Sequence, residues 1–221
     1  SIAEMKEYLA LCMDGEGTIP ERKMMLTPWN KDRILVDPFC GSGTFPIEAA
    51  MIGARIAPGM NRSFTAQKWD NLLTRQAWMD AVEEAEDQIL RDVKMSIQGY
   101  DIDSSIVKCA MENARAAGVD QQIHFQQRSV AELSHPKKYG FIITNPPYGE
   151  RLEEKEELPD LYRMIAASFD RLDTWSKYII TSYEDAEKYL GRKADKNRKI
   201  YNGMIKSYFY QFMGPKPPRR S

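Results

Sequence analysis

The chain has few of the residues that build disulfide frameworks and metal centres. Its 221 residues include three cysteines, Cys12, Cys40 and Cys109, and two histidines, His124 and His135. The cysteines are odd in number and widely spaced, which argues against a disulfide framework and is typical of a protein in a reducing cytoplasm. Neither histidine has a second Cys or His at ligand spacing, so we expect no structural zinc and no other metal.

Long apolar runs and a strong net charge are also missing. Hydrophobic residues make up 43% of the chain, but no run of 18 or more exists, so we expect no transmembrane helix, no signal peptide and no membrane partner. The net charge of −1 offers no general attraction to nucleic acid. Basic residues do crowd one stretch, and such runs are most often solvated faces: Arg192, Lys193, Lys196, Arg198 and Lys199.

The chain also lacks the complete glycine-rich motifs that bind phosphate groups. An apolar run at 34–37 enters the turn Gly41-Ser42-Gly43 and leaves as a helical pattern, which predicts a strand, a loop and a helix. The two glycines allow the backbone to approach a ligand closely. The third glycine of the dinucleotide fingerprint and the Gly-Lys-Ser/Thr ending of a P-loop are both missing. We therefore expect neither a nicotinamide nor a polyphosphate ligand.

A carboxylate ends the second predicted strand, which covers residues 96–101. At the tip of a strand beside a glycine-rich loop, Asp101 can accept both hydroxyls of a ribose. Its alternative role is to cap the following helix. Asp103 and Ser104 are better placed for that task.

The pentapeptide Asn145-Pro146-Pro147-Tyr148-Gly149 follows the apolar run 141–144. Because proline lacks a backbone N–H, this strand must stop there. The Asn145 amide and the Pro146 carbonyl are then acceptors at the carboxyl edge of a sheet, beside the flat ring of Tyr148. This arrangement suits a planar amine. The alternative for this segment is purely structural: the prolines end the strand before a turn. The alternative for Tyr148 is packing against the neighbouring helix.

Three segments together resemble a known family. They are Asp37-Pro-Phe-Cys-Gly-Ser-Gly-Thr, Gly99-Tyr-Asp-Ile-Asp and Asn145-Pro-Pro-Tyr-Gly-Glu-Arg. In this order they resemble the methyltransferase domain of the THUMP-associated RNA guanine-N2 methyltransferases, most of all the bacterial large-subunit ribosomal RNA group. The segment 52–64, which contains Ala-Pro-Gly-Met-Asn-Arg, and Trp69 after it add to this similarity. The resemblance covers roughly residues 30 to 213.

The resemblance implies S-adenosylmethionine as the cofactor and ribosomal RNA as the substrate, with methyl transfer to the N2 amine of a guanine. It implies cofactor contacts from Asp37, Phe39, Cys40, Gly41, Ser42, Gly43, Thr44, Asp101, Ile102, Ser129, Val130 and Asn145. The catalytic residues would be Asn145, Pro146 and Tyr148. For Phe39, simple packing is the alternative. Family members carry an N-terminal THUMP domain, so we expect one in the full-length protein.

Two positions depart from the family pattern. Related enzymes often place an acidic residue after the third strand, where this chain has Ser129. Backbone groups near Ser129 and Val130 could recognise adenine instead, or Glu132 could reach in from the next turn. The second departure is the segment 13–28, which is Gly-rich and polar where relatives have a helix over the cofactor.

The order of predicted elements indicates one α/β domain. Apolar runs predict strands at 34–37, 96–101, 123–127, 140–144, 177–182, 198–202 and 205–212, and helices at 2–12, 69–92, 104–117, 158–172 and 183–190. We expect Trp78, Val82, Ala85 and Ile89 to be core residues of the helix at 69–92. Alternation of this kind favours a mainly parallel sheet covered on both faces, and Asn202-Gly203 favours a final antiparallel hairpin.

The predicted fold is therefore a Rossmann-like class I methyltransferase with a seven-stranded sheet. We expect an N-terminal helical or lid segment at 1–29, the methyltransferase domain at 30–214 and a tail at 215–221. Methylation of adenine N6 and of a glutamine amide on a protein share the same amine geometry, and both stay open. A noncatalytic RNA-binding scaffold is the alternative outside the enzymes.

Overall fold

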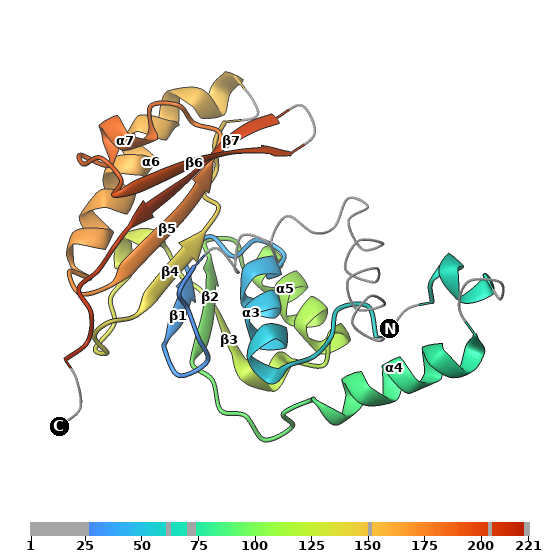
Figure 1. Cartoon of the computed structure of the whole chain (residues 1–221). Coiled ribbons are helices and arrows are strands. Elements are labelled where there is room, and N and C mark those ends of the chain that lie inside the picture. Colours follow the sequence, from blue (N-terminus) through green and yellow to red (C-terminus); the bar gives the residue numbers. More distant parts are fainter. Residues whose placement is uncertain (1–26, 61–62, 70–73, 150–151, 203–204, 219–221) are drawn as a thin grey trace.

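The computed structural model describes residues 27–60, 63–69, 74–149, 152–202 and 205–218 (Figure 1). The predicted helix at 2–12, Cys12 and most of the segment 13–28 lie outside these residues.

A seven-stranded sheet forms the centre of the molecule, in the order β3-β2-β1-β4-β5-β7-β6. Its strands are β1 (Leu35–Asp37), β2 (Ile97–Asp101), β3 (Ile123–Gln127), β4 (Phe141–Thr144), β5 (Ser176–Thr181), β6 (Lys196–Asn202) and β7 (Ile205–Phe212). Strands β1 to β5 pair in parallel, whereas β7 runs antiparallel to both of its neighbours. The predicted fold class, a mainly parallel sheet that ends in an antiparallel hairpin, is confirmed.

The central strands read as short, continuous apolar runs because helices cover them on both sides. Every residue of β1 and of β4 is buried, as expected of parallel strands in a doubly covered sheet. Helices α3 (Thr44–Ala54) and α5 (Ser104–Ala116) pack on one side of β1, β2 and β3 (Figure 1). Helix α6 (Leu152–Asp170) and the single turn α7 (Ala186–Tyr189) pack together on the other side.

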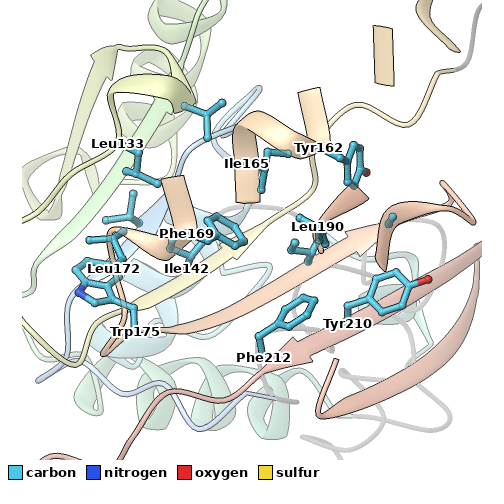
Figure 2. Close-up of a cluster of buried hydrophobic side chains, with 14 of the residues drawn as sticks. Leu133, Ile142, Tyr162, Ile165, Phe169, Leu172, Trp175, Leu190, Tyr210 and Phe212 are labelled. Carbon is cyan, nitrogen blue, oxygen red and sulfur yellow. The ribbon is translucent and has the colours of Figure 1, made fainter. Parts of the chain in front are cut away.

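Two hydrophobic clusters fill the spaces on the two faces of the sheet. The cluster on the α6 side is built from α6, β4 and the C-terminal strands, and Figure 2 shows ten of its side chains labelled. The other cluster joins α3 and α5 to the opposite face and includes Leu35, Ala49, Ile143 and Phe209. Strand β7 serves both clusters, since Phe209 belongs to one and Tyr210 to the other.

The strand order places a topological switch point between β1 and β4. From β1 the chain builds outward through β2 and β3, and it then returns to place β4 on the other side of β1. In open α/β sheets, ligands bind at the carboxyl ends of the strands where the order reverses. The loops that leave β1 and β4 there are residues 38–43 and 145–149.

The helix predicted at 69–92 is shorter than expected, and the prediction of its core was wrong. Helix α4 covers Arg75–Asp87 with Thr74 as its N-cap, and a short 3₁₀ turn η1 (Thr65–Lys68) precedes it. Trp78, Val82 and Ala85 are only half-buried, as is Ile89 beyond the end of the helix, and none of the four belongs to either hydrophobic cluster. Trp78, Val82 and Ala85 face residues 57–60, Phe64 and Gln67. An apolar stripe shows that a helix face is covered, but not by which part of the chain.

Two other helix boundaries also differ from the prediction. Helix α6 begins at Leu152, six residues before the expected start, and contains Pro159. The helix predicted at 183–190 is reduced to the four residues of α7. No helix among the described residues is long and apolar enough to cross a membrane.

Candidate cofactor and substrate site

A cavity of about 550 Å³ opens at the switch point. That volume lies within the usual range for small-molecule sites. The loops after β1, β2, β3 and β4 and one face of α6 form its wall. The lining residues are Pro38, Phe39, Gly41, Asp101, Ile102, Arg128, Ser129, Val130, Asn145, Pro146, Pro147, Tyr148, Gly149, Leu161 and Met164.

The loop after β1 is shaped by its two glycines. Gly41 has a φ of 53° and Gly43 a φ of 90°, values that residues with a Cβ rarely adopt. A Cβ on Gly41 would meet no atom within 4 Å, because this glycine borders the open cavity. A Cβ on Gly43 would lie 3.1 Å from the Ala110 side chain. Gly43 therefore lets α3 start close against α5, whereas Gly41 leaves the backbone bare towards a ligand.

Asp101 connects the loop after β1 to the end of β2. Its Oδ2 accepts the Gly41 N–H at 3.2 Å, and its Oδ1 accepts the Asp103 N–H at 3.0 Å. Each carboxylate oxygen has a second lone pair, so both oxygens can still accept the hydroxyls of a ribose. As predicted, Asp103 caps α5, since its Oδ1 accepts the Ser105 N–H at 2.7 Å.

The part of the cavity next to Asp101 is lined by apolar and basic groups. Ile102 is 71% exposed although it is a large aliphatic residue, and Val130 is buried on the facing loop. Arg128 lines the cavity as well. Its guanidinium donates to the Glu132 carbonyl at 2.7 Å and lies 5.3 Å from the centre of the Tyr100 ring.

Ser129 is mainly a cap in this structure. Its hydroxyl accepts the Ala131 N–H at 3.2 Å, which begins the 3₁₀ turn η3 (Val130–Glu132). The Glu132 side chain is not among the groups that line the cavity.

The segment after β4 presents its polar groups to the cavity. Asn145 is exposed and Pro146 buried, while Tyr148 is half-buried at the cavity wall. The Asn145 amide makes no hydrogen bond to another residue of the described part of the chain. Its oxygen and nitrogen are therefore available to a molecule in the cavity.

A buried hydrogen bond joins the loops after β1 and β4 from behind. The Thr144 hydroxyl donates to Asp37 Oδ1 at 2.6 Å, and the Phe39 N–H donates to the same oxygen at 3.1 Å. Asp37 is 1% exposed and Thr144 is fully buried. Burial, the largest effect, raises the pKa of Asp37 to about 7, although the two hydrogen bonds oppose it. Burial and the charges of Asp37 and Asp101 also raise the pKa of the Cys40 thiol, which keeps it unreactive.

Helix α6 supports the same segment from the other side. The hydroxyl of buried Tyr162 donates to the Pro147 carbonyl at 3.4 Å and shares a hydrogen bond of 2.6 Å with the Thr181 hydroxyl. Burial raises the pKa of Tyr162, so the phenol stays neutral. Asn145 is thus flanked by one side-chain hydrogen bond at Thr144 and another at Pro147.

The structure brings most of the predicted site residues together. Phe39, Gly41, Asp101, Ile102, Ser129, Val130, Asn145, Pro146 and Tyr148 all line the cavity. Asp37, Cys40, Ser42, Gly43 and Thr44 do not line it, so their cofactor contacts stay predictions.

Sequence reasoning missed other parts of the cavity wall. Arg128 follows directly after β3, where loop residues face ligands. Leu161 and Met164 are three residues apart on α6, so they share one helix face. Helical spacing after the Asn-Pro-Pro-Tyr segment was the available signal for this pair.

Comparison with known proteins places this geometry in a family. Residues 2–211 match the model of the RMKL-like methyltransferase domain. This chain belongs to that family. The Bacillus subtilis (strain 168) protein YpsC, named as a candidate RNA methyltransferase, is 43% identical over 92% of this chain and 52% of its own length. The ribosomal RNA large subunit methyltransferase K/L of Shewanella baltica (strain OS185) is 39% identical over 79% of this chain and 25% of its own length.

Two solved structures share the fold. SMU.472, crystallised with S-adenosylhomocysteine, is 40% identical and superposes with a TM-score of 0.86 over 90% of this chain and 53% of that one. A Listeria monocytogenes (strain 4b F2365) protein described as an N6-adenine-specific DNA methylase is 45% identical, with a TM-score of 0.83 over 90% and 51% of the two chains. The chain spans about half the length of YpsC and of both these structures.

The expected fold, enzyme class and cofactor are confirmed by these findings. The RMKL-like domain is a methyltransferase, and its cofactor is S-adenosylmethionine, whose demethylated product is held by SMU.472. The cavity of this chain fits that cofactor, because it offers a bare backbone at Gly41, a carboxylate at Asp101 and apolar walls at Ile102 and Val130. No cluster of three or more metal-binding side chains occurs among the described residues.

Proposed function

We propose that this chain methylates the exocyclic N2 amine of a guanine in ribosomal RNA. One observation carries the proposal: Gly41 and Asp101, expected at the cofactor, share a single cavity with the available amide of Asn145. The names of YpsC and of the K/L methyltransferase support RNA, and the latter supports ribosomal RNA, as the substrate.

The cofactor supplies an electrophilic methyl group on a sulfonium. Asn145 Oδ1 and the Pro146 carbonyl accept the two hydrogens of the target amine, which turns its lone pair towards that methyl group. These fixed dipoles would also stabilise the positive charge that develops on nitrogen as the N–C bond forms and the bond between the methyl group and sulfur breaks, which would release neutral S-adenosylhomocysteine. Alignment of the two reactants contributes much of the rate, up to roughly 7–11 kcal/mol in favourable cases.

Tyr148 would stack on the target base, and Tyr162 holds its segment in place through the Pro147 carbonyl. The proton leaves the methylated amine to water, so no strong base is needed in the cavity. Unstacking a base costs only a few kcal/mol when the base is already unpaired, which favours a loop or single-stranded target. We also propose that the part of the full-length protein beyond this chain contains the expected THUMP domain.

Transfer of tritium from labelled cofactor to unmodified ribosomal RNA, followed by nucleoside analysis, tests the proposal. We expect label in N2-methylguanosine. Label in N6-methyladenosine would instead support the adenine alternative, which the name of the Listeria monocytogenes relative favours. Label confined to protein would support glutamine methylation. Failure to bind S-adenosylhomocysteine in calorimetry would support the noncatalytic scaffold.

Two substitutions test which residues of the cavity bind the cofactor and which act on the target amine. Asn145→Ala should lower kcat by about 10²–10³-fold, because its dipole acts in the transition state, while the affinity for S-adenosylhomocysteine stays within about twofold. Asp101→Ala should weaken that affinity about 10–100-fold, since hydrogen bonds to a charged group are worth about 1.5–3 kcal/mol. Calorimetry and steady-state kinetics measure both effects. Equal losses of cofactor affinity in the two variants would contradict the assigned roles.

A further inference from the structure

A run of positive charge lies on the outer edge of the sheet. The segment 192–206 contains one carboxylate, Asp195, and six cations: Arg192, Lys193, Lys196, Arg198, Lys199 and Lys206. Its net charge is +5, whereas the whole chain carries −1, so the rest of the chain sums to −6. A net positive charge therefore gathers on β6 and the residues next to it, at the end of the sheet where Figure 1 shows β6.

Three of these cations are free to meet a partner. Lys196, Arg198 and Lys199 are exposed on β6. The ion pairs found nearby among the described residues use other cations, namely Arg192 with Asp195 and Lys206 with Glu184. Within the described part of the chain, strand β6 is also the last strand of the sheet and pairs with β7 alone. Part of its backbone N–H and C=O groups therefore point outward, between the cationic side chains.

Charged side chains on an edge, lysine above all, discourage pairing with another strand, so edge protection accounts for part of this pattern. The charge goes beyond that need, because four lysines and two arginines gather within fifteen residues that contain a single carboxylate. Lysine and arginine side chains together with backbone N–H groups are the donors that bind nucleic-acid phosphates. The chemistry thus fits a polyanion better than another protein strand.

The edge is also well placed relative to the cavity. Strand β6 points in the same direction as β4, because β7 between β5 and β6 is antiparallel to both. Through the paired residues Ile179 and Tyr210, the end of β4 at Thr144 lies level with Asn197 of β6, three strand spacings away. The cations of β6 on either side of Asn197 therefore lie level with the start of the Asn145 segment. At about 4.8 Å per spacing the separation is ~14 Å, roughly four nucleotide steps of ~3.4 Å along a nucleic-acid helix.

We propose that the β6 edge, defined by Lys196, Arg198 and Lys199, binds phosphates of the RNA strand that flanks the target nucleotide. The inference rests on the proposed function for the identity of the polyanion. It adds a docking surface outside the cavity and gives the RNA a direction, from the Asn145 segment across β5 and β7 to β6.

A charge-matched pair of triple variants tests the surface. One variant combines Lys196→Gln, Arg198→Gln and Lys199→Gln. The control combines Lys94→Gln, Lys108→Gln and Arg115→Gln, three exposed cations on the β2 and α5 side of the molecule. Both variants lose three positive charges. Filter binding of large-subunit ribosomal RNA transcribed in vitro, over a range of salt concentrations, gives the affinity and its salt dependence.

We expect the β6 variant to bind this RNA at least about tenfold more weakly at moderate salt, with the slope of log K against log[salt] reduced by about 2. The control should stay close to the wild type. Both variants should keep the wild-type melting temperature and affinity for S-adenosylhomocysteine. Equal RNA affinity of the β6 variant and the wild type would overturn the inference, as would an equal loss in the control.

The proposed function can fail separately. If the wild-type chain bound RNA through the β6 edge but transferred no methyl group to it, the surface would stand and the proposed function would fall. If methyl transfer to guanine were normal in both triple variants, with unchanged KM for RNA, only the surface would fall.

Discussion

At the scale of single residues, the contact between Asp37 and Thr144 is the part of the site that local patterns do not reveal. Both residues end apolar runs that are more than one hundred positions apart. The sequence identifies Asp37 as a member of the glycine-loop motif and Thr144 as the last residue of a strand. Only the sheet order, which makes β1 and β4 neighbours, brings them within 2.6 Å.

The hydroxyl of Thr144 should matter for catalysis more than for cofactor binding. Thr144→Val removes the hydrogen bond to Asp37 and frees the start of the Asn145 segment, so we expect kcat to fall about tenfold. The affinity for S-adenosylhomocysteine should stay near the wild-type value. Thr144→Ser keeps the hydroxyl and should restore kcat. If kcat of Thr144→Ser were as low as that of Thr144→Val, the shape of the side chain, and not its hydrogen bond to Asp37, would control catalysis.

Asp37 should also make stability depend on pH. Its pKa is raised from 3.8 to about 7, so between about pH 4 and 7 the folded chain holds a proton that the unfolded chain lacks. The contribution of Asp37 to the free energy of unfolding then falls as pH rises through this window and levels off above it.

The Asp37→Asn variant has no carboxyl group to titrate at this position, so its free energy of unfolding serves as the reference for the wild type. We expect the stability of the wild type relative to this variant to decrease from about pH 4 to pH 7, as measured by urea unfolding. A difference that increased over the same range would show that the carboxyl has a lowered pKa in the folded state.

At the scale of helices and strands, prediction succeeded where one local signal was sufficient. The apolar runs of β1 and β4, the cap at Asp103 and the pairing of Asn202 with Ile205 in the final hairpin could all be predicted from neighbouring residues. The start of α6 could not. A proline is most common in the first turn of a helix, whereas this helix begins at Leu152, six residues before the predicted start, and runs through Pro159.

Local sequence patterns were also insufficient to predict the surroundings of α4 and part of the cavity wall. Periodicity identified the apolar face around Trp78 but did not show that residues 57–60 and Phe64 cover it. For Leu161 and Met164, the spacing alone did not show that their face borders the cavity instead of the core.

The junction before β4 is tightly packed and should tolerate no extra atom. A Cβ on Gly140 would lie 2.6 Å from atoms of the Trp175 ring, and Trp175 is 1% exposed. Gly140→Ala should therefore lower the free energy of unfolding by about 1–3 kcal/mol. Urea denaturation measures this loss. Gly191→Ala offers a comparison in which the Cβ meets nothing within 4 Å and only the positive φ of 71° is strained. A loss at Gly140 no greater than at Gly191 would count against the packing explanation.

At the scale of the whole molecule, α4 stands apart from the two clusters that hold the sheet together. Its apolar face packs on residues 57–60 and on Phe64, with the Trp78 and Phe64 rings 5.8 Å apart. This unit should therefore open more easily than the rest of the fold.

Trp78→Ala tests that independence. We expect faster amide hydrogen exchange in residues 75–87, with nearly unchanged protection of β1 and β4 and unchanged affinity for S-adenosylhomocysteine. Loss of protection throughout the sheet would show that α4 is part of the same cooperative unit.

The position of β7 has a consequence for how the protein is made. Of the seven strands of the sheet, β7 is synthesised last, yet it is inserted between β5 and β6 and supplies Phe209 to one cluster and Tyr210 and Phe212 to the other. A nascent chain that still lacks these residues leaves apolar surface on both faces of the sheet without cover. Completion of this sheet must therefore wait until β7 has emerged from the ribosome.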